Sequence, residues 1–390
     1  MNWLLTATLV LLPSISVAQE ADAPTDEELF LDFGKKVAAS INRLEPGILD
    51  SAFDMKVMGE RITRDVDVDK DFRKGFLGAL DGAMAMGMHI CQAIELDGSY
   101  SFLGLREREG KPHLLFRMLA DGALNYHELE VVRDKRDRVR VNDAFIYLSG
   151  EYYSATSRRV YVRAAAEQNR GILSSLMGED SEFFESVDII DRFHDLAGQG
   201  KFKEALAEYD KLPESVAKSR FMQQSRIVVA QEMPEEIYLA ALEEYLTLFP
   251  KDAGLSLLMI DAHMYREEFA ESLKAVDKLD NSVGGDPYLD CLRANILLAS
   301  GEVDDAFAKA RRACSSQPGL EDTWWTLVGM GLMAERWAAV AEGLDGLEAN
   351  FEIELYDLAT VEEFAGFAAS EEGKAWIAKQ TVVEEETDEG

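Results

Sequence analysis

The chain has 390 residues, with 47% hydrophobic and 9% aromatic residues, which excludes a disordered protein and allows a sizeable buried core. Its formal net charge of −33 disfavours binding to nucleic acid or to an anionic membrane surface, because both are negatively charged. Residues 151–390 hold 22 Lys and Arg against 48 Asp and Glu, a balance of −26. This acidity favours a basic partner, although solubility or adaptation to a salty medium explains it equally well.

Residues 1–18 have the layout of a secretory signal peptide. An apolar stretch is followed by small residues ending at Ala18, after which the chain turns polar and acidic. An uncleaved anchor is the alternative, but the apolar stretch is short and ends at Pro13. No later apolar run is long enough to cross a membrane. The sequence therefore predicts a periplasmic or secreted protein without membrane insertion after signal cleavage.

Residues 25–150 combine two kinds of periodicity. Helical patterns cover about 25–45, 50–63 and 69–92. Period-two segments with turn signals between them follow at Ser99–Leu105, His113–Leu119, Leu124–Val132 and Arg138–Leu148. This order predicts an α+β domain with helices on one face of a four-stranded antiparallel sheet. It is similar to the cystatin-like and NTF2-like folds in element order alone, which implies no function.

A ligand pocket in this domain would lie between the sheet and its helices. The polar residues that could line it are Arg117, Tyr126, His113, His127 and Glu128. Strand residues of these types also occur as solvent-facing or cross-strand partners, so the pocket has a structural alternative. If it exists, the protein is a small-molecule binder or a hydrolase, supported by the second half of the chain.

Metal, cofactor and catalytic motifs give no specific signal. The aspartates between Asp65 and Asp71 are spaced as in a calcium loop, but Lys70 and Phe76 replace the required Gly and Glu. Capping of the following helix explains these aspartates. Glycines and methionines of 69–92 are typical of close packing. The sequence contains no zinc-protease, serine-hydrolase or phosphate-loop motif, and we predict no metal, cofactor or catalytic residue.

After linking helices in 151–185, including about Tyr153–Gln168, one apolar pattern occurs five times within 186–350. In its first copy, Ala205, Tyr209 and Leu212 follow Phe202 by three, seven and ten residues, on one face of a helix. The other copies open at Tyr238, Phe269, Val303 and Trp337. Because a second apolar-periodic segment precedes each copy, the pattern predicts five helix pairs stacked in an α-helical solenoid.

This stretch resembles the tetratricopeptide repeat (TPR) family. The closest matches are Gly200-x-Phe202-x-x-Ala205-x-x-x-Tyr209 and Gly301-x-Val303-x-x-Ala306, with Trp324 at an early aromatic position. Most first helices lack the family's Leu-Gly pair, and several core alanines are Ser or Val. The resemblance implies a superhelix whose inner surface, formed by the first helix of each pair, binds an extended peptide or a partner's helix.

The family register directs seven residues toward that surface: Arg226, Asp261, Tyr265, Tyr288, Asn295, Trp325 and Met333. Alternatively, some of the aromatic residues pack between repeats. The family's carboxylate clamp needs a Lys one turn from Asn295, and that position is Cys291. The resemblance therefore does not extend to binding of a partner's C-terminus.

The remaining features complete the domain plan. Residues 351–380 predict a capping helix, and the acidic residues 381–390 predict a disordered tail. Cys291 and Cys314 fall on opposite helices of one predicted pair, where a disulfide or two buried thiols would fit. The sequence thus predicts an exported, non-catalytic interaction scaffold or adaptor for a protein or peptide partner, with assembly into homo-oligomers as a further outcome.

Overall fold

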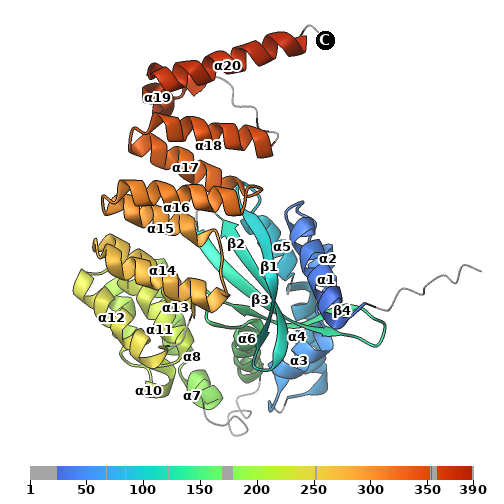
Figure 1. Cartoon of the computed structure of the whole chain (residues 1–390). Coiled ribbons are helices and arrows are strands. Elements are labelled where there is room, and N and C mark those ends of the chain that lie inside the picture. The colour runs from blue at the N-terminus through green and yellow to red at the C-terminus, as the bar shows by residue number, and fades with distance from the viewer. Residues whose placement is uncertain are drawn as a thin grey trace, which may run out of the picture.

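The structure is a computed structural model, which describes residues 24–388 except 67, 84, 121–122, 169–178, 251–252, 352 and 354–357. The expected export signal, residues 1–18, lies outside the described residues. An N-terminal group of helices is followed by an antiparallel sheet and then by a long array of paired helices (Figure 1). This confirms the fold class that the sequence predicts.

In the part of the chain that the structure describes, five helices precede the sheet: α1 (Asp26–Ile41), α2 (Gly47–Ala52), α3 (Met55–Thr63), α4 (Lys70–Ala83) and α5 (Met86–Ala93). Side-chain caps explain where α1, α3 and α4 begin, and Asp54 caps α3 through the Lys56 and Val57 amides. At α1, the Thr25 hydroxyl accepts the Glu28 amide while the Glu28 carboxylate accepts the Thr25 amide, which is a capping box. At α4, the Asp71 amide donates to Asp69 Oδ1 at 2.8 Å, so Asp69 caps the helix as expected.

The single helix expected over 69–92 is instead two helices, α4 and α5. Helix α5 begins against α2, where the Gly87 amide donates to Asp50 Oδ1 at 2.6 Å. A Cβ atom at Gly87 would lie 2.9 Å from the Pro46 carbonyl oxygen, so this approach requires glycine. A contact distant in sequence therefore overrides the local periodicity.

The sheet is an antiparallel meander in the order β1-β2-β3-β4-β5. Its strands are β1 (Ser99–Arg108), β2 (Lys111–Ala120), β3 (Ala123–Arg133), β4 (Val139–Ile146) and β5 (Glu151–Tyr152). The first four match the period-two segments of the sequence. The fifth is a correction to the expected count, because a two-residue strand is too short to show a periodicity.

Helices α1–α5 and α6 (Tyr153–Gln168) cover one face of the sheet. Strand residues such as Phe116, Leu129 and Val141 share a buried cluster with helix residues such as Val37 and Met58. Helix α6 contributes Tyr161, Val162 and Ala165 to the same cluster. Although the sequence assigns α6 to a linker, its packing makes it part of the first domain's core.

Among the described residues, the second half forms five helix pairs, one for each copy of the repeated pattern. The pairs are α8 (Val187–Gly198) with α9 (Phe202–Tyr209), α11 (Arg220–Ala230) with α12 (Glu235–Leu248), α13 (Ala253–Tyr265) with α14 (Phe269–Val283), α15 (Leu289–Ala299) with α16 (Val303–Ser316), and α17 (Glu321–Met333) with α18 (Trp337–Asn350). Short helices α7 (Glu179–Glu185) and α10 (Glu214–Ala217) precede the first and second pairs. Four of the five pattern copies open on the first residue of a second helix, and Tyr238 lies within the first turn of α12.

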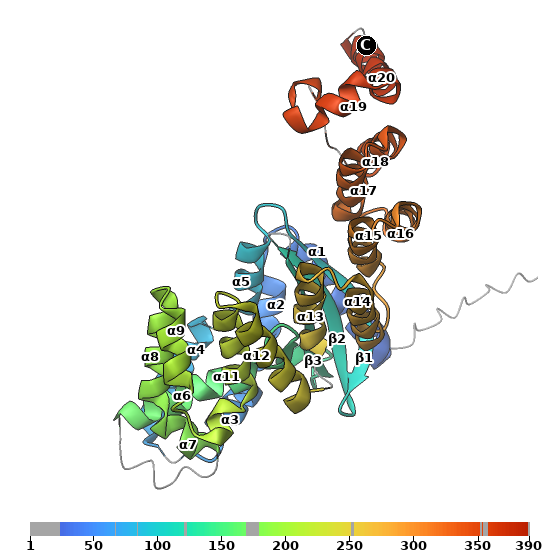
Figure 2. The same ribbon diagram turned by 90° about the vertical axis from the view of Figure 1, so that its left-hand side faces the viewer.

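The other face of the sheet is covered by the middle of the helix array. One buried cluster contains Tyr126 of β3 and Tyr147, which directly follows β4, together with Ile260 of α13, Leu279 of α14 and Leu289 of α15. The sheet therefore has helices on both faces, and Figure 2 shows α17 and α18 continuing beyond it. The sequence predicts the first helical layer but not the second.

Beyond α18 the chain forms a terminal cap. It comprises η2 (Leu358–Thr360), η3 (Glu362–Phe364), α19 (Ala365–Ala369) and α20 (Glu371–Asp388). Phe364, Phe367 and Trp376 pack against Leu344 and Leu347 of α18, so these elements close the last pair. The backbone of α20 stays helical through residues 381–388, in contrast to the disordered tail expected from composition, because Glu is a good helix former. Among the described helices, none is both long and apolar enough to span a membrane.

Candidate protein-binding site

Arg117 and Tyr126, two of the five residues expected to line a pocket, face the helix array and bind the same carboxylate. Arg117 Nη1 lies 2.6 Å from Asp286 Oδ1, and the Tyr126 hydroxyl donates to Asp286 Oδ2 at 2.8 Å. All three side chains are buried. Arg117 also donates to Gln317 Oε1 at 3.1 Å. These residues hold the array against the sheet.

His113 and His127, two more of the five, also have protein partners. His113 Nδ1 lies 3.0 Å from the Lys111 carbonyl oxygen, and its Nε2 lies 3.4 Å from the Tyr152 hydroxyl. His127 lies on the face covered by α1–α6, within 3.3 Å of both the Tyr100 hydroxyl and Asn125 Nδ2. Burial lowers the pKa of both imidazoles, that of His127 to about 4. The two histidines therefore do not form one site.

The face of the sheet that is covered by the helix array contains a second charge network, centred on the buried Glu128. Glu128 Oε1 accepts from Arg106 at 3.0 Å and from the Tyr147 hydroxyl, while Oε2 accepts from Arg108. These contacts outweigh the effect of burial and lower the pKa of Glu128. Arg106 also donates to the Ser282 carbonyl oxygen of α14 at 2.9 Å. Glu128 is thus another contact between sheet and array.

Two of the seven residues expected on the inner surface of the array are occupied by contacts within the protein. Tyr288 lies beneath the Arg117 guanidinium, whose central carbon is 4.9 Å from the ring centroid. Arg226 forms an ion pair with Glu244 and lies 5.2 Å from the Tyr209 ring centroid. These contacts stabilise the array and leave little of either side chain for a partner.

The other five are exposed on the first helices of the third, fourth and fifth pairs: Asp261 and Tyr265 on α13, Asn295 on α15, and Trp325 and Met333 on α17. Tyr265 is 83% exposed, Met333 71% and Trp325 37%. Trp325 Nε1 donates to Glu321 at 2.8 Å, which holds the indole against its own helix. Large apolar side chains left open in this way are typical of protein-interaction surfaces.

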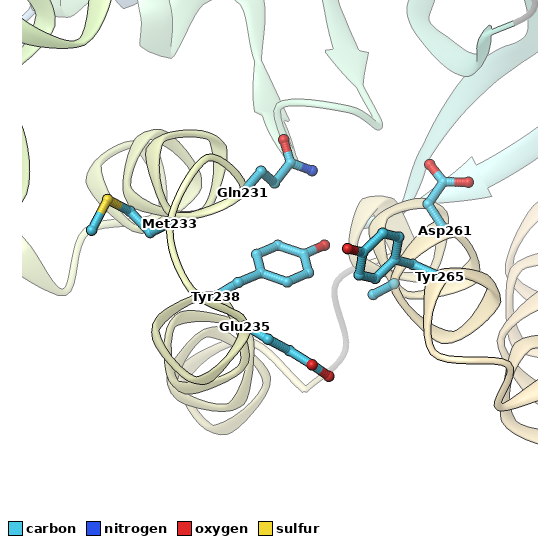
Figure 3. A pocket seen from close by; sticks show the side chains of 7 residues that line it. Gln231, Met233, Glu235, Tyr238, Asp261 and Tyr265 are labelled. Atoms are coloured by element: carbon cyan, nitrogen blue, oxygen red, sulfur yellow. The ribbon is translucent and has the colours of Figure 1, made fainter. Parts of the chain in front are cut away.

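Asp261 and Tyr265 meet a set of residues from the preceding pair in a pocket of about 310 Å³. Tyr238 and Glu235 reach it from the start of α12, and Figure 3 shows the two tyrosines directed toward one another across it. The remaining lining residues are Gln231, Met233 and Ala262. In the sequence, Tyr238 is the aromatic residue that opens the second copy of the repeat, which predicts a core position. The structure shows that it also lines this pocket, which the repeat pattern does not predict.

The pocket carries an acidic group without a counter-ion. Within the described part of the chain, the Asp261 carboxylate has no hydrogen-bond or ion-pair partner, and desolvation by its surroundings raises its pKa. Glu235 lies 3.7 Å from Arg266, which also approaches Glu268. The Tyr238 hydroxyl interacts with the Gln231 side chain. The pocket therefore combines two aromatic walls with an uncompensated carboxylate.

No cluster of three or more metal-ligating side chains occurs among the described residues. No protein-family model matches the chain, and no curated protein matches it. Among solved structures, one match is PilW, described as a widely conserved type IV pilus biogenesis factor, with 14% sequence identity and a TM-score of 0.36. The match covers 50% of this chain and 92% of that chain, and it is too distant to assign a function.

Proposed function

We propose that the chain is an exported, non-catalytic scaffold or adaptor whose helix array binds another protein. The observation that carries this proposal is the exposure of Tyr265, Trp325 and Met333 on the first helices of the third and fifth pairs. Side chains of these types concentrate binding energy at protein interfaces. The helix array supplies a rigid, extended support for them.

Two more specific parts of the proposal, a basic partner and export, are supported by the net charge and by the N-terminal segment. The balance of −26 over residues 151–390 favours a basic partner, because opposite charges speed encounter and disfavour acidic competitors. The signal-like layout of residues 1–18 supports export to a periplasm or to the medium.

The alternative, a small-molecule binder or hydrolase in residues 25–150, has less support from the geometry. It requires Arg117, Tyr126, His113 and His127 to face a shared cavity. Instead, all four are buried with protein partners, and the histidines lie on opposite faces of the sheet.

The test is affinity capture from the exported fraction with the full mature chain and with a Trp325→Ala/Met333→Ala variant. We expect one partner to be recovered by the wild type and its affinity to fall about thirtyfold in the variant, as when an interface hot spot is truncated. Leu96→Ala, which removes an exposed apolar side chain outside the array, is the matched control and should retain binding.

Equal capture by wild type and double variant, with unchanged helicity by circular dichroism, would contradict the proposal. Light scattering addresses self-assembly separately. If the captured species is a second copy of this chain, the mass will rise with concentration and the adaptor interpretation fails.

A further inference from the structure

The pocket between α11, α12 and α13 has the chemistry of a receptor for a positively charged side chain. Tyr238 and Tyr265 extend into it from opposite sides with their hydroxyl groups toward one another, and an aromatic ring attracts a cation within about 6 Å of its centroid. Ala262 and the side-chain carbons of the tyrosines offer apolar contact to an aliphatic stem. Lysine and arginine combine such a stem with a charged end.

The Asp261 carboxylate determines the sign of the charge. It lies four residues before Tyr265 on α13, so both side chains share one face of the helix. Nearby Arg266 is directed to Glu235 and Glu268, and it does not line the pocket. An incoming cation would therefore meet a carboxylate that has no partner among the described residues and could pair with it through charge-assisted hydrogen bonds.

The shape of the pocket favours a side chain presented by a polypeptide over a free metabolite. Its volume of about 310 Å³ is at the lower end for small-molecule sites, which span about 300–1,000 Å³. Tyr265 is 83% exposed, so one wall stays open to water, whereas small-molecule sites bury most of their ligand. A partner's backbone could cross this open wall while one of its side chains enters.

We propose that this pocket binds a lysine or arginine side chain from a basic segment of the partner protein. The inference rests on the proposed scaffold function and adds the chemistry of one contact. It also gives the negative charge of the array a specific role, because the surrounding acidic surface would guide a basic segment to the pocket.

The experiment uses the full mature chain labelled with ¹⁵N at tyrosine and a short Gly/Ser peptide with one central lysine. Titration followed by NMR should shift the amide signals of Tyr238 and Tyr265, which single Tyr variants identify. The same peptide with arginine should bind similarly. A peptide with Nε-acetyl-lysine, which keeps the stem but loses the charge, should bind at least about tenfold more weakly.

Three variants separate the aromatic from the electrostatic contribution. Tyr265→Phe keeps the ring and should bind within about twofold of the wild type, whereas Tyr265→Leu should bind about tenfold more weakly. Asp261→Asn should lose about tenfold, and Asp304→Asn, which changes an exposed carboxylate on α16, should have no effect. Equal affinity for the acetylated peptide, or no shift at either tyrosine, would overturn the inference.

Tetramethylammonium, a free cation, tests whether the pocket prefers a side chain carried by a polypeptide. If this ion binds as tightly as the lysine peptide, the assignment to a polypeptide is overturned. The two proposals fail separately. Capture that depends on Trp325 and Met333 without peptide binding at Tyr265 would remove only this inference. Peptide binding at Tyr265 without capture would remove only the partner-binding role of α17.

Discussion

Arg117 and Asp286 form a buried ion pair with an Nη1–Oδ1 distance of 2.6 Å, although 169 residues separate them in the sequence. Arg117 belongs to β2, and Asp286 lies between α14 and α15. The pair therefore joins the sheet to the helix array, and Tyr126 completes the contact from β3. Its effect on stability is open to direct measurement.

Replacing Arg117 with Met should lower the free energy of unfolding by about 3–5 kcal/mol, because it leaves the Asp286 charge buried without its cation. An Arg117→Met/Asp286→Leu double variant should recover part of that loss. Arg43→Met is the control, because Arg43 pairs with Glu45 on the surface and should lose less than about 1 kcal/mol. Urea unfolding measures all three, and a loss below about 1 kcal/mol for Arg117→Met would contradict the prediction.

His127 should make the protein less stable in acid. Burial lowers its pKa from 6.5 to about 4, so the unfolded state takes up a proton first as the pH falls. Above about pH 6.5 the imidazole is neutral in both the folded and the unfolded state, so it adds no pH dependence to the free energy of unfolding. Between about pH 6.5 and 4 its contribution should fall by up to about 3 kcal/mol and then level off.

His127→Gln removes this titration, so the difference in unfolding free energy between wild type and variant should change over that pH range. Urea unfolding at a series of pH values provides the measurement. His89→Gln, which changes an exposed histidine on α5, is the matched control for the substitution itself. A wild-type-minus-His127→Gln difference independent of pH would refute the assignment.

Two glycines in the last helix pair should respond oppositely to alanine. At Gly346, a Cβ atom would lie 2.1 Å from Trp324 Cε3, so Gly346→Ala should lower the free energy of unfolding by about 1–3 kcal/mol. At Gly329, nothing lies within 4 Å, and Gly329→Ala should leave stability unchanged or raise it by up to about 1 kcal/mol. Thermal unfolding measures the midpoint temperature of each variant. Equal midpoints for the two variants would contradict the prediction, because they would mean that α17 and α18 can move apart to accept the added methyl group.

The three cysteines should resist thiol reagents in the native protein. Cys91, Cys291 and Cys314 are free and buried, and burial raises the pKa of Cys291 to about 12 and that of Cys314 to about 11. Because the thiolate is the reactive form, a chromogenic disulfide reagent at about pH 8 should react only after unfolding. It should then count three thiols per chain, whereas a disulfide between Cys291 and Cys314 would leave one.

The repeat pattern could be predicted from sequence because it is local. Spacings within one helix position Phe202 and Ala205 on the buried face, whatever the rest of the chain does. The second layer over the sheet could not be predicted in this way. A period-two strand shows that Leu115 and Arg117 share a face, but it does not show which distant segment covers that face.

The candidate site shows the same limit. The repeat register places Asp261 and Tyr265 on one helix face, and the structure finds them in one pocket. Tyr238 and Gln231 come from the preceding pair, so their contribution depends on how two pairs stack. Arg117 and Tyr126 have the polarity of ligand-binding residues, but they bind Asp286 of the same chain.

The two-sided covering of the sheet has a consequence for the order in which the chain is synthesised. All five strands are complete by residue 152, whereas the helices that cover their second face, α13–α15, end at residue 299. Until those helices emerge, Tyr126 and Tyr147 remain open to water or to any chaperone present. Arg106 and Glu128 lie on the same face, so we expect the charges that later fix the array also to limit aggregation of the sheet during that interval.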